Sequence, residues 1–147
     1  MRRFAVVAVA GLLVALGSTS ALASGTVQAS GSGQTYQSAT FGFNADSNLA
    51  GHLNYLTDDG AYHVLCSQID TFSGSVSGSE GSANFTATCT LKDGTPVYAR
   101  VSAYDDGEPG TGDWFCIGIS YVSASGPYFI FDKGFIQAGN IQVHNTN

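Results

Sequence analysis

Four carboxylates crowd one short segment of this chain, and side chains of this type can bind a cation. Asp105, Asp106, Glu108 and Asp113 lie within nine residues, between two runs in which apolar and polar residues alternate. Carboxylate and main-chain carbonyl oxygens are the ligands that Ca²⁺ prefers. Two interpretations are open. The four side chains form a calcium site, or the segment is a solvated turn in which Asp105 and Asp113 accept backbone N–H bonds.

Three cysteines leave room for one disulfide. Cys66 and Cys89 flank a Gly- and Ser-rich stretch at 73–82, and if these flanks pair as a hairpin, the two cysteines lie opposite each other. We therefore predict a Cys66–Cys89 disulfide. The odd number leaves Cys116 over, and its alternating neighbours predict a half-buried thiol.

The sequence contains His, Ser and Asp residues, which hydrolases use in catalysis, but not in the spacing of a known hydrolase motif. His52, His63 and His144 are the only histidines, and none lies two or four residues from another. No Gly-x-Ser-x-Gly elbow occurs in the sequence. We therefore assign no catalytic residue and keep a small secreted hydrolase, using Asp or His side chains, as an alternative function.

Four aromatic residues occupy the alternate positions that point away from the core in their predicted strands. If the apolar rows of the two segments that flank the acidic turn face the core, alternation directs Tyr98, Tyr104, Trp114 and Tyr121 outward. Outward rings can stack on sugars or dock a protein partner. The alternative is that they cover a second sheet or a neighbouring loop.

Short strands are the elements that must position these residues. From residue 39 on, apolar and polar residues alternate, as in 84–91 and 97–103, and clusters of Gly, Asp and Ser separate the runs. No window of about a dozen residues repeats apolar positions at helical spacing. The pattern predicts one all-β domain over 39–147, an antiparallel β-sandwich of about eight or nine short strands, with a barrel as the alternative. Residues 24–38, rich in Ser, Gly and Gln, are predicted to be a flexible leader.

The first 23 residues have the order of a secretory signal peptide. A basic start at Arg2 and Arg3 precedes an apolar run over 4–16, and Ala21 and Ala23 mark a cleavage site. The run is shorter than the roughly 20 residues that a membrane-spanning helix needs, and no second such run follows. We therefore predict a secreted protein with no membrane span in the mature chain. Cleavage leaves three basic residues against 11 acidic ones, a formal net charge of −8, which excludes a general nucleic-acid binder.

Two motifs resemble those of a known family. The turn Asp-x-Gly-Glu-Pro-Gly-x-x-Asp-x-Phe-x-Ile at 105–117 and the ending Gly-Asn-Ile-Gln-Val-His at 139–144 resemble segments of secreted bacterial β-domains called the post-COAP type. The stretches at 41–43 and 51–55 are similar to that family's opening, so the resemblance covers about residues 40–144. It implies a non-catalytic β-module that larger exported proteins often carry at their end. The cysteines and Gly118 depart from the family's pattern.

These observations predict a secreted, acidic, non-catalytic β-domain that acts by binding, or as a structural module, at the cell exterior. Its partner would be an extracellular protein or a polysaccharide, because outward aromatic rings suit both. Two alternatives follow from particular residues: a calcium-dependent polysaccharide-binding domain from the acidic turn, and the small hydrolase. Calcium is the one cofactor that the sequence suggests.

Overall fold

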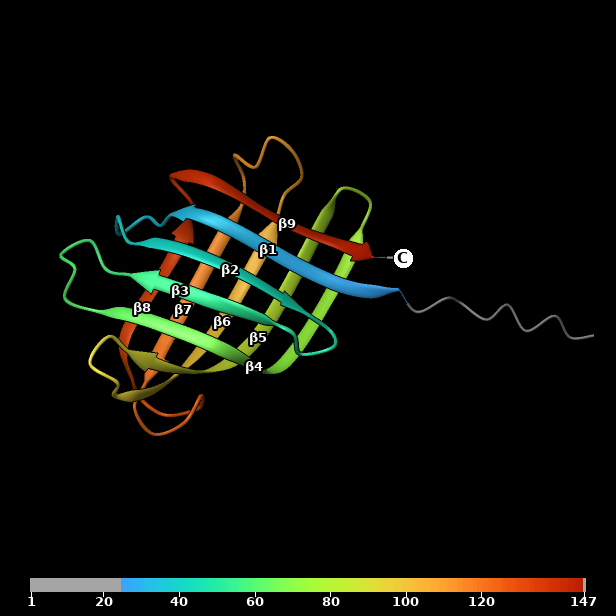
Figure 1. Cartoon of the computed structure of the whole chain (residues 1–147). Coiled ribbons are helices and arrows are strands. Elements are labelled where there is room, and N and C mark those ends of the chain that lie inside the picture. The colour runs from blue at the N-terminus through green and yellow to red at the C-terminus, as the bar shows by residue number, and fades with distance from the viewer. Residues whose placement is uncertain (1–24, 147) are drawn as a thin grey trace, which may run out of the picture.

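Nine antiparallel strands follow one another in the computed structural model of this chain, which describes residues 25–146 (Figure 1). They are β1 (Thr26–Gln34), β2 (Thr40–Asp46), β3 (Gly51–Leu56), β4 (His63–Ser77), β5 (Glu80–Leu91), β6 (Pro96–Asp105), β7 (Trp114–Ser120), β8 (Tyr128–Phe135) and β9 (Ala138–Thr146). All nine belong to one sheet, in the order β8-β7-β6-β5-β4-β3-β2-β1-β9. The described residues contain no helix, and so none that could cross a membrane. The predicted signal peptide, 1–23, lies outside the described residues.

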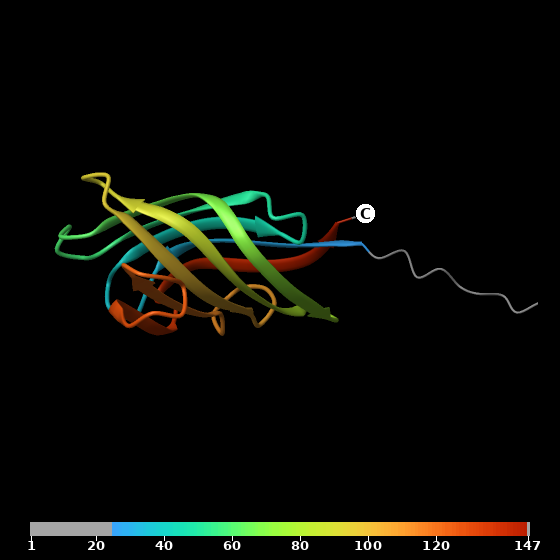
Figure 2. The ribbon, with the colours of Figure 1, turned by 90° about the horizontal axis from the view of Figure 1, so that it is seen from below.

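The sheet curls over itself at β4, so that its two halves face each other. The first residues of β4 pair with β3, as Cys66 does opposite Leu53, whereas the rest of this long strand pairs only with β5. Shifts of register after Cys66 and after Ile69 mark bulges, which bend a strand and increase its twist. β4 and β5 therefore run diagonally from the layer of β9, β1, β2 and β3 to the layer of β6, β7 and β8 (Figure 2). The predicted antiparallel all-β fold is confirmed; the two separate sheets of a sandwich are not, because the strands form one continuous sheet.

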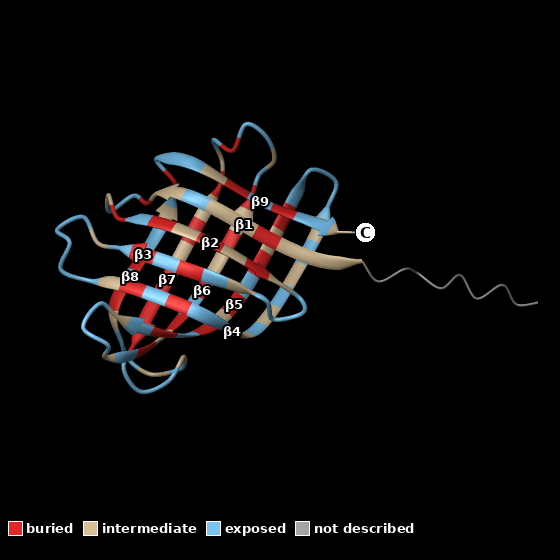
Figure 3. Ribbon diagram, viewed as in Figure 1, coloured by how far each residue is buried: buried red, intermediate tan, exposed pale blue. Residues whose placement is uncertain are grey.

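The apolar core lies between these two layers. Buried and exposed residues alternate along the strands (Figure 3), in agreement with the period-two pattern of the sequence. Rings from opposite layers meet in the core: Phe41 stacks on Phe115 with ring centroids 4.1 Å apart, and the Phe43 and Phe85 centroids are 5.5 Å apart. Each of these four rings is at most 5% exposed. Burial of one such side chain contributes about 1.5–3 kcal/mol, so these contacts hold the layers together.

The prediction of a flexible leader is wrong over Thr26–Gln34, because this segment forms β1 between β2 and β9. Close packing against its neighbours requires a glycine at position 31 of this strand. A Cβ at Gly31 would come within 2.8 Å of the Phe43 ring and 3.0 Å of the Ile141 side chain, closer than carbon atoms approach one another. Gly31 therefore leaves room for large neighbours from β2 and β9.

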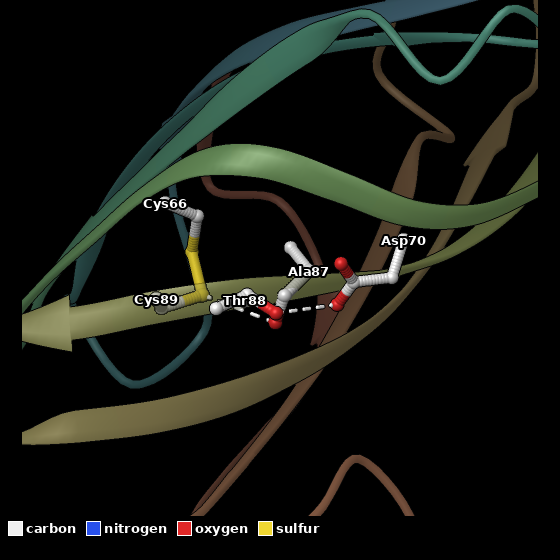
Figure 4. The surroundings of a disulfide bond; sticks show 5 residues. All are labelled: Cys66, Asp70, Ala87, Thr88 and Cys89. Atoms are coloured by element: carbon white, nitrogen blue, oxygen red, sulfur yellow. Dashed lines mark hydrogen bonds between the residues drawn. A yellow bond between two sulfur atoms is a disulfide. The ribbon is translucent and has the colours of Figure 1, made fainter.

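The predicted disulfide is confirmed. Cys66 of β4 lies directly opposite Cys89 of β5, and the two are bonded, with their Cα atoms 4.0 Å apart. The hairpin turns at Gly78, near the predicted centre. Figure 4 shows the bridge together with Asp70, whose carboxylate accepts a hydrogen bond from the Thr88 hydroxyl at 2.8 Å. The two links tie β4 to β5 where the bulges interrupt their ladder.

Candidate functional site

The acidic turn lies against the free edge of β9. This strand pairs with β1 on one side, and its other side faces the turn between β6 and β7. Asp105 Oδ2 accepts the N–H of Val143 at 2.8 Å, and Asp113 Oδ2 accepts the N–H of Ile141 at 2.6 Å. The two carboxylates thus take the place of a neighbouring strand. We call Asp105, Glu108 and Asp113 the edge clamp.

Asp105 and Asp113 each receive a second backbone donor. Asp105 Oδ1 accepts the N–H of Gly107 at 2.8 Å, and Asp113 Oδ1 accepts that of Asp106 at 3.0 Å. Both side chains are buried. Burial raises the pKa of Asp113, although its two N–H donors oppose the rise. All four carboxylate oxygens therefore accept a backbone hydrogen bond, as in the second interpretation of the turn, but in a buried rather than a solvated place.

Glu108 extends the edge clamp to the side chains of β9. Its Oε1 accepts from Gln142 Nε2 at 2.8 Å and from Asn140 Nδ2 at 2.9 Å, and these bonds lower the pKa of Glu108. Asp106, the fourth residue of the predicted calcium site, is exposed. Within residues 25–146 no group of three or more His, Cys, Asp or Glu side chains is arranged to hold a metal ion. The calcium site is the untested alternative to this hydrogen-bonded arrangement.

A row of aromatic side chains crosses the outer face of the other layer. The register places Tyr104 of β6 opposite Trp114 of β7, and Trp114 opposite Phe135 of β8. The next residue of β7, Phe115, points into the core, so the members of this row point outward. Phe135 is 65% exposed. Neighbouring strands lie about 4.8 Å apart, so the row extends over roughly 10 Å.

Three more aromatic residues lie on the same side of the sheet. Together with the row they form what we call the aromatic face: Tyr98, Tyr104, Trp114, Tyr128, Phe131 and Phe135. Tyr128 and Phe131 stack with ring centroids 5.9 Å apart. The Tyr128 ring also covers Gly118, where an added Cβ would come within 2.8 Å of the ring. Gly118, which interrupts the apolar pattern of its strand, therefore leaves the space that this ring occupies.

Polar neighbours hold the rings of the aromatic face. The Tyr104 hydroxyl donates to Glu80 at 2.8 Å, and this bond raises the pKa of Tyr104. Lys133 Nζ lies 5.6 Å from the centroid of the Phe131 ring, within range of a cation–π interaction. Cys116 is a free, half-buried thiol, as predicted, and lies opposite Lys133.

Three of the four aromatic residues predicted from the sequence lie on this face; the fourth does not. Tyr121 lies beyond the end of β7 and stacks on Phe129 with centroids 4.0 Å apart, while Phe129 also contacts Tyr62 at 5.4 Å. Sequence reasoning missed the aromatic residues of β8, because there the charged Asp132 is buried while Phe131 and Phe135 face outward, the reverse of the usual pattern. The signal that could have found them is Phe131, Lys133 and Phe135 at every second position, which places these three side chains on one face of a strand.

The three histidines lie on different strands: His52 on β3, His63 on β4 and His144 on β9. A ring nitrogen of His63 lies 2.9 Å from Asn54 Oδ1. A hydrolase triad needs a histidine hydrogen-bonded to a nucleophile and to a carboxylate, and no histidine within 25–146 bonds to a serine or a carboxylate. The hydrolase alternative stays a prediction.

A buried carboxylate on β8 ties three elements together. Asp132 is 1% exposed, and its Oδ2 accepts hydrogen bonds from the hydroxyl groups of Thr35 and Tyr55. Burial raises the pKa of Tyr55, and the nearby charge of Asp132 adds to the rise. These bonds link β3 and the turn between β1 and β2 to the inner side of β8.

No family model, no curated protein and no solved structure matches this chain. The geometry of the edge clamp and of the aromatic face therefore carries the functional reasoning.

Proposed function

We propose that this protein is a secreted, non-catalytic β-domain that binds a polysaccharide through its aromatic face. The observation that carries the proposal is the outward row of Tyr104, Trp114 and Phe135. Large apolar side chains are stabilised by burial, and a contiguous group of them in solvent marks a site of interaction. Phe131 and Phe135 are 49% and 65% exposed, so the described part of the chain leaves this face open.

The chemistry of the face suits a sugar chain. A pyranose ring has an apolar C–H side and a rim of hydroxyl groups, so it is best bound by an aromatic ring beside hydrogen-bonding groups. The rows between the aromatic ones supply such groups: Ser102 donates to Asn84 at 2.7 Å, and Arg100 lies two residues before Ser102. Because the sheet already positions these side chains, binding orders few of them, which favours affinity.

The opposite outer face offers hydrogen bonds without stacking. There β9, β1, β2 and β3 line a depression that includes Ser30, Ser32, Asn54 and Gln142, and Phe43, which also lines it, is 4% exposed and packs in the core. These groups provide no outward Phe, Tyr or Trp ring on which a sugar could stack. The aromatic face is therefore the better polysaccharide site.

The disulfide between Cys66 and Cys89 supports export, because disulfides form and persist in oxidising compartments outside the cytosol. The signal-peptide pattern of the first 23 residues agrees with this. The resemblance to the post-COAP type agrees with a module that binds rather than catalyses.

Retention on polysaccharides tests the proposal. We expect the purified protein to bind insoluble cellulose or chitin in a depletion assay, or to be retarded by a soluble polysaccharide in a native gel. Phe135→Ala removes an exposed ring without opening the core, and it should weaken binding about tenfold, as should Trp114→Ala. Tyr62→Ala is the matched control, because it removes a ring from the separate cluster with Phe129.

The outcomes separate the site from the function. Circular dichroism and thermal melting establish that each variant is folded. Unchanged binding in both Phe135→Ala and Trp114→Ala would refute the aromatic face, and loss of binding in Tyr62→Ala alone would place the site at the end of β7. Retention on no polysaccharide would refute the proposed function.

A further inference from the structure

The charges on the aromatic face narrow the choice of polysaccharide. Between Ser82 and Thr88 of β5, the outward positions of β5, β6, β7 and β8 form four cross-strand rows of four: Ser82–Tyr104–Trp114–Phe135, Asn84–Ser102–Cys116–Lys133, Thr86–Arg100–Gly118–Phe131 and Thr88–Tyr98–Ser120–Tyr128. None of these sixteen residues is acidic, and the two carboxylates that bond to them do so at the borders of the face, Glu80 to Tyr104 and Asp70 to Thr88. Two are basic, Arg100 and Lys133, and they are two of the three Lys and Arg residues within 25–146.

Each of the two cations has aromatic neighbours on its own strand. Lys133 lies two residues from both Phe131 and Phe135, and its Nζ is 5.6 Å from the centroid of the Phe131 ring. Arg100 follows Tyr98 at the same spacing on β6. Side chains two residues apart on a strand share one face of the sheet. A ligand stacked on these rings therefore has a positive charge beside it.

The positive charges act at the centre of the face. Cys116 lies opposite Lys133 and one row away from Arg100. Burial raises the pKa of the Cys116 thiol, and the charge of Asp132 beneath the sheet adds to the rise, whereas Lys133 and Arg100 oppose it. In a chain with a formal net charge of −6, the centre of this face thus holds two cations, while Glu80 and Asp70 lie at its borders.

We infer that the polysaccharide is a polyuronate, whose sugar rings stack on the aromatic face while its carboxylates pair with Arg100 and Lys133. A uronate presents the same apolar ring side as a neutral sugar and adds a carboxylate at its rim. The planar guanidinium of Arg100 can bond both oxygens of one carboxylate, and Lys133 supplies a point charge. This inference rests on the proposed function, because it names the class of polymer that the same face binds.

A matched pair of polymers tests the inference. Polygalacturonate and its fully methyl-esterified form share one backbone and differ in the carboxylate charge. At about 0.15 M salt the Debye length is about 8 Å, so charges farther from the face than this are largely screened, while Glu80 and Asp70 at its borders are the same in every variant compared. We expect the acid form to bind about five- to tenfold more tightly than the ester in affinity electrophoresis, and the preference to disappear at about 1 M salt.

Variants assign the preference to the two cations. Arg100→Gln combined with Lys133→Gln removes both charges and leaves every ring, so the double variant should bind the acid form no better than the ester. Lys92→Gln is the matched control, because it removes the third cation, which lies in the turn between β5 and β6, and it should keep the preference.

Each outcome bears on one of the two proposals. Equal binding of both polymers by the wild-type protein, or binding of neutral polymers such as cellulose alone, would refute the inference that the ligand is a polyuronate. The proposed function, polysaccharide binding, would still stand. A preference that persists in the double variant would overturn the role of the two cations. Binding of no polysaccharide, or binding confined to vesicles of anionic phospholipid, would refute the proposed function itself.

Discussion

Replacing Asp105 by Asn should destabilise the domain through β9. Asp105 is 6% exposed, and its two oxygens accept the N–H groups of Gly107 and Val143, each at 2.8 Å. Asparagine keeps one acceptor and replaces the other with an NH₂ group, which donates and cannot accept. One of the two backbone N–H groups then loses its partner at the edge of the sheet.

The expected size follows from this single loss. A hydrogen bond to a charged group contributes about 1.5–3 kcal/mol, and a buried donor left without a partner costs about 1–3 kcal/mol. Both figures describe the same lost bond, so we expect the free energy of unfolding of Asp105→Asn to fall by about 2 kcal/mol. In a domain of this size 1 kcal/mol corresponds to about 3–5 °C, which predicts a fall in Tm of roughly 6–10 °C.

Thermal melting followed by circular dichroism, together with urea unfolding, measures the change. Asp106→Asn is the matched control, because it removes the same charge from the next residue, whose side chain is exposed; its effect should stay below about 0.5 kcal/mol. Amide hydrogen exchange adds a local readout, since the Val143 N–H should exchange faster in Asp105→Asn only. Equal Tm values for the two variants would refute the edge clamp.

Three further perturbations test other parts of the structure. Cys66→Ser with Cys89→Ser removes a bridge between positions 23 apart and should lower the free energy of unfolding by about 3 kcal/mol in urea, whereas Cys116→Ser should change it by less than about 0.5 kcal/mol; a small loss in the double variant would contradict the disulfide's role. Excess Ca²⁺ should give the same Tm as EDTA, because every carboxylate oxygen of Asp105 and Asp113 already accepts an N–H; a rise of several degrees that Asp106→Asn abolishes would establish the calcium site instead. The raised pKa of Asp113 means that the folded state binds this proton more tightly, so its stabilising contribution is complete below the unfolded pKa of about 3.9 and is lost as the pH rises through the folded pKa. Asp113→Asn should flatten the profile of Tm against pH in that window, and an unchanged slope would count against the raised pKa.

Local pattern was enough to predict the features that depend on near neighbours in sequence. Alternation predicted the central strands, and the symmetric positions of Cys66 and Cys89 about the hairpin predicted the disulfide. β1 was missed because the reason for its Gly31 lies in other strands: the side chains of Phe43 and Ile141 leave no room for a Cβ at this position. A composition rich in Gly and Ser has the same appearance whether it serves flexibility or close packing.

The candidate site could be predicted only in part, for a related reason. Strand parity placed Tyr104 and Trp114 on the outer side of the sheet, because both lie on regular strands. On β8 the charged Asp132 is buried while Phe131 and Phe135 face outward, so hydrophobicity along this strand does not indicate which face points to the core. That the aromatic residues of three strands form one face is a property of the strand order, which the sequence does not state.

The two motifs that carry the family resemblance are the two halves of one contact. The acidic turn supplies the carboxylates of Asp105, Glu108 and Asp113, and the ending at 139–144 supplies the backbone N–H and side-chain amide groups that they accept. The contact satisfies the open edge of β9, which would otherwise be free to pair with another chain. A pattern that maintains a fold in this way does not identify a ligand.

Different mutations should therefore affect the stability of the fold and the binding of polysaccharide separately. Asp105→Asn acts on the edge of β9 and should lower Tm while the molecules that remain folded bind polysaccharide with unchanged affinity. Phe135→Ala acts on the far side of the sheet, where the ring is 65% exposed, and should keep Tm while binding weakens. Loss of binding by folded Asp105→Asn would mean that the acidic turn itself contacts the ligand, and the aromatic face would then be only one part of the site.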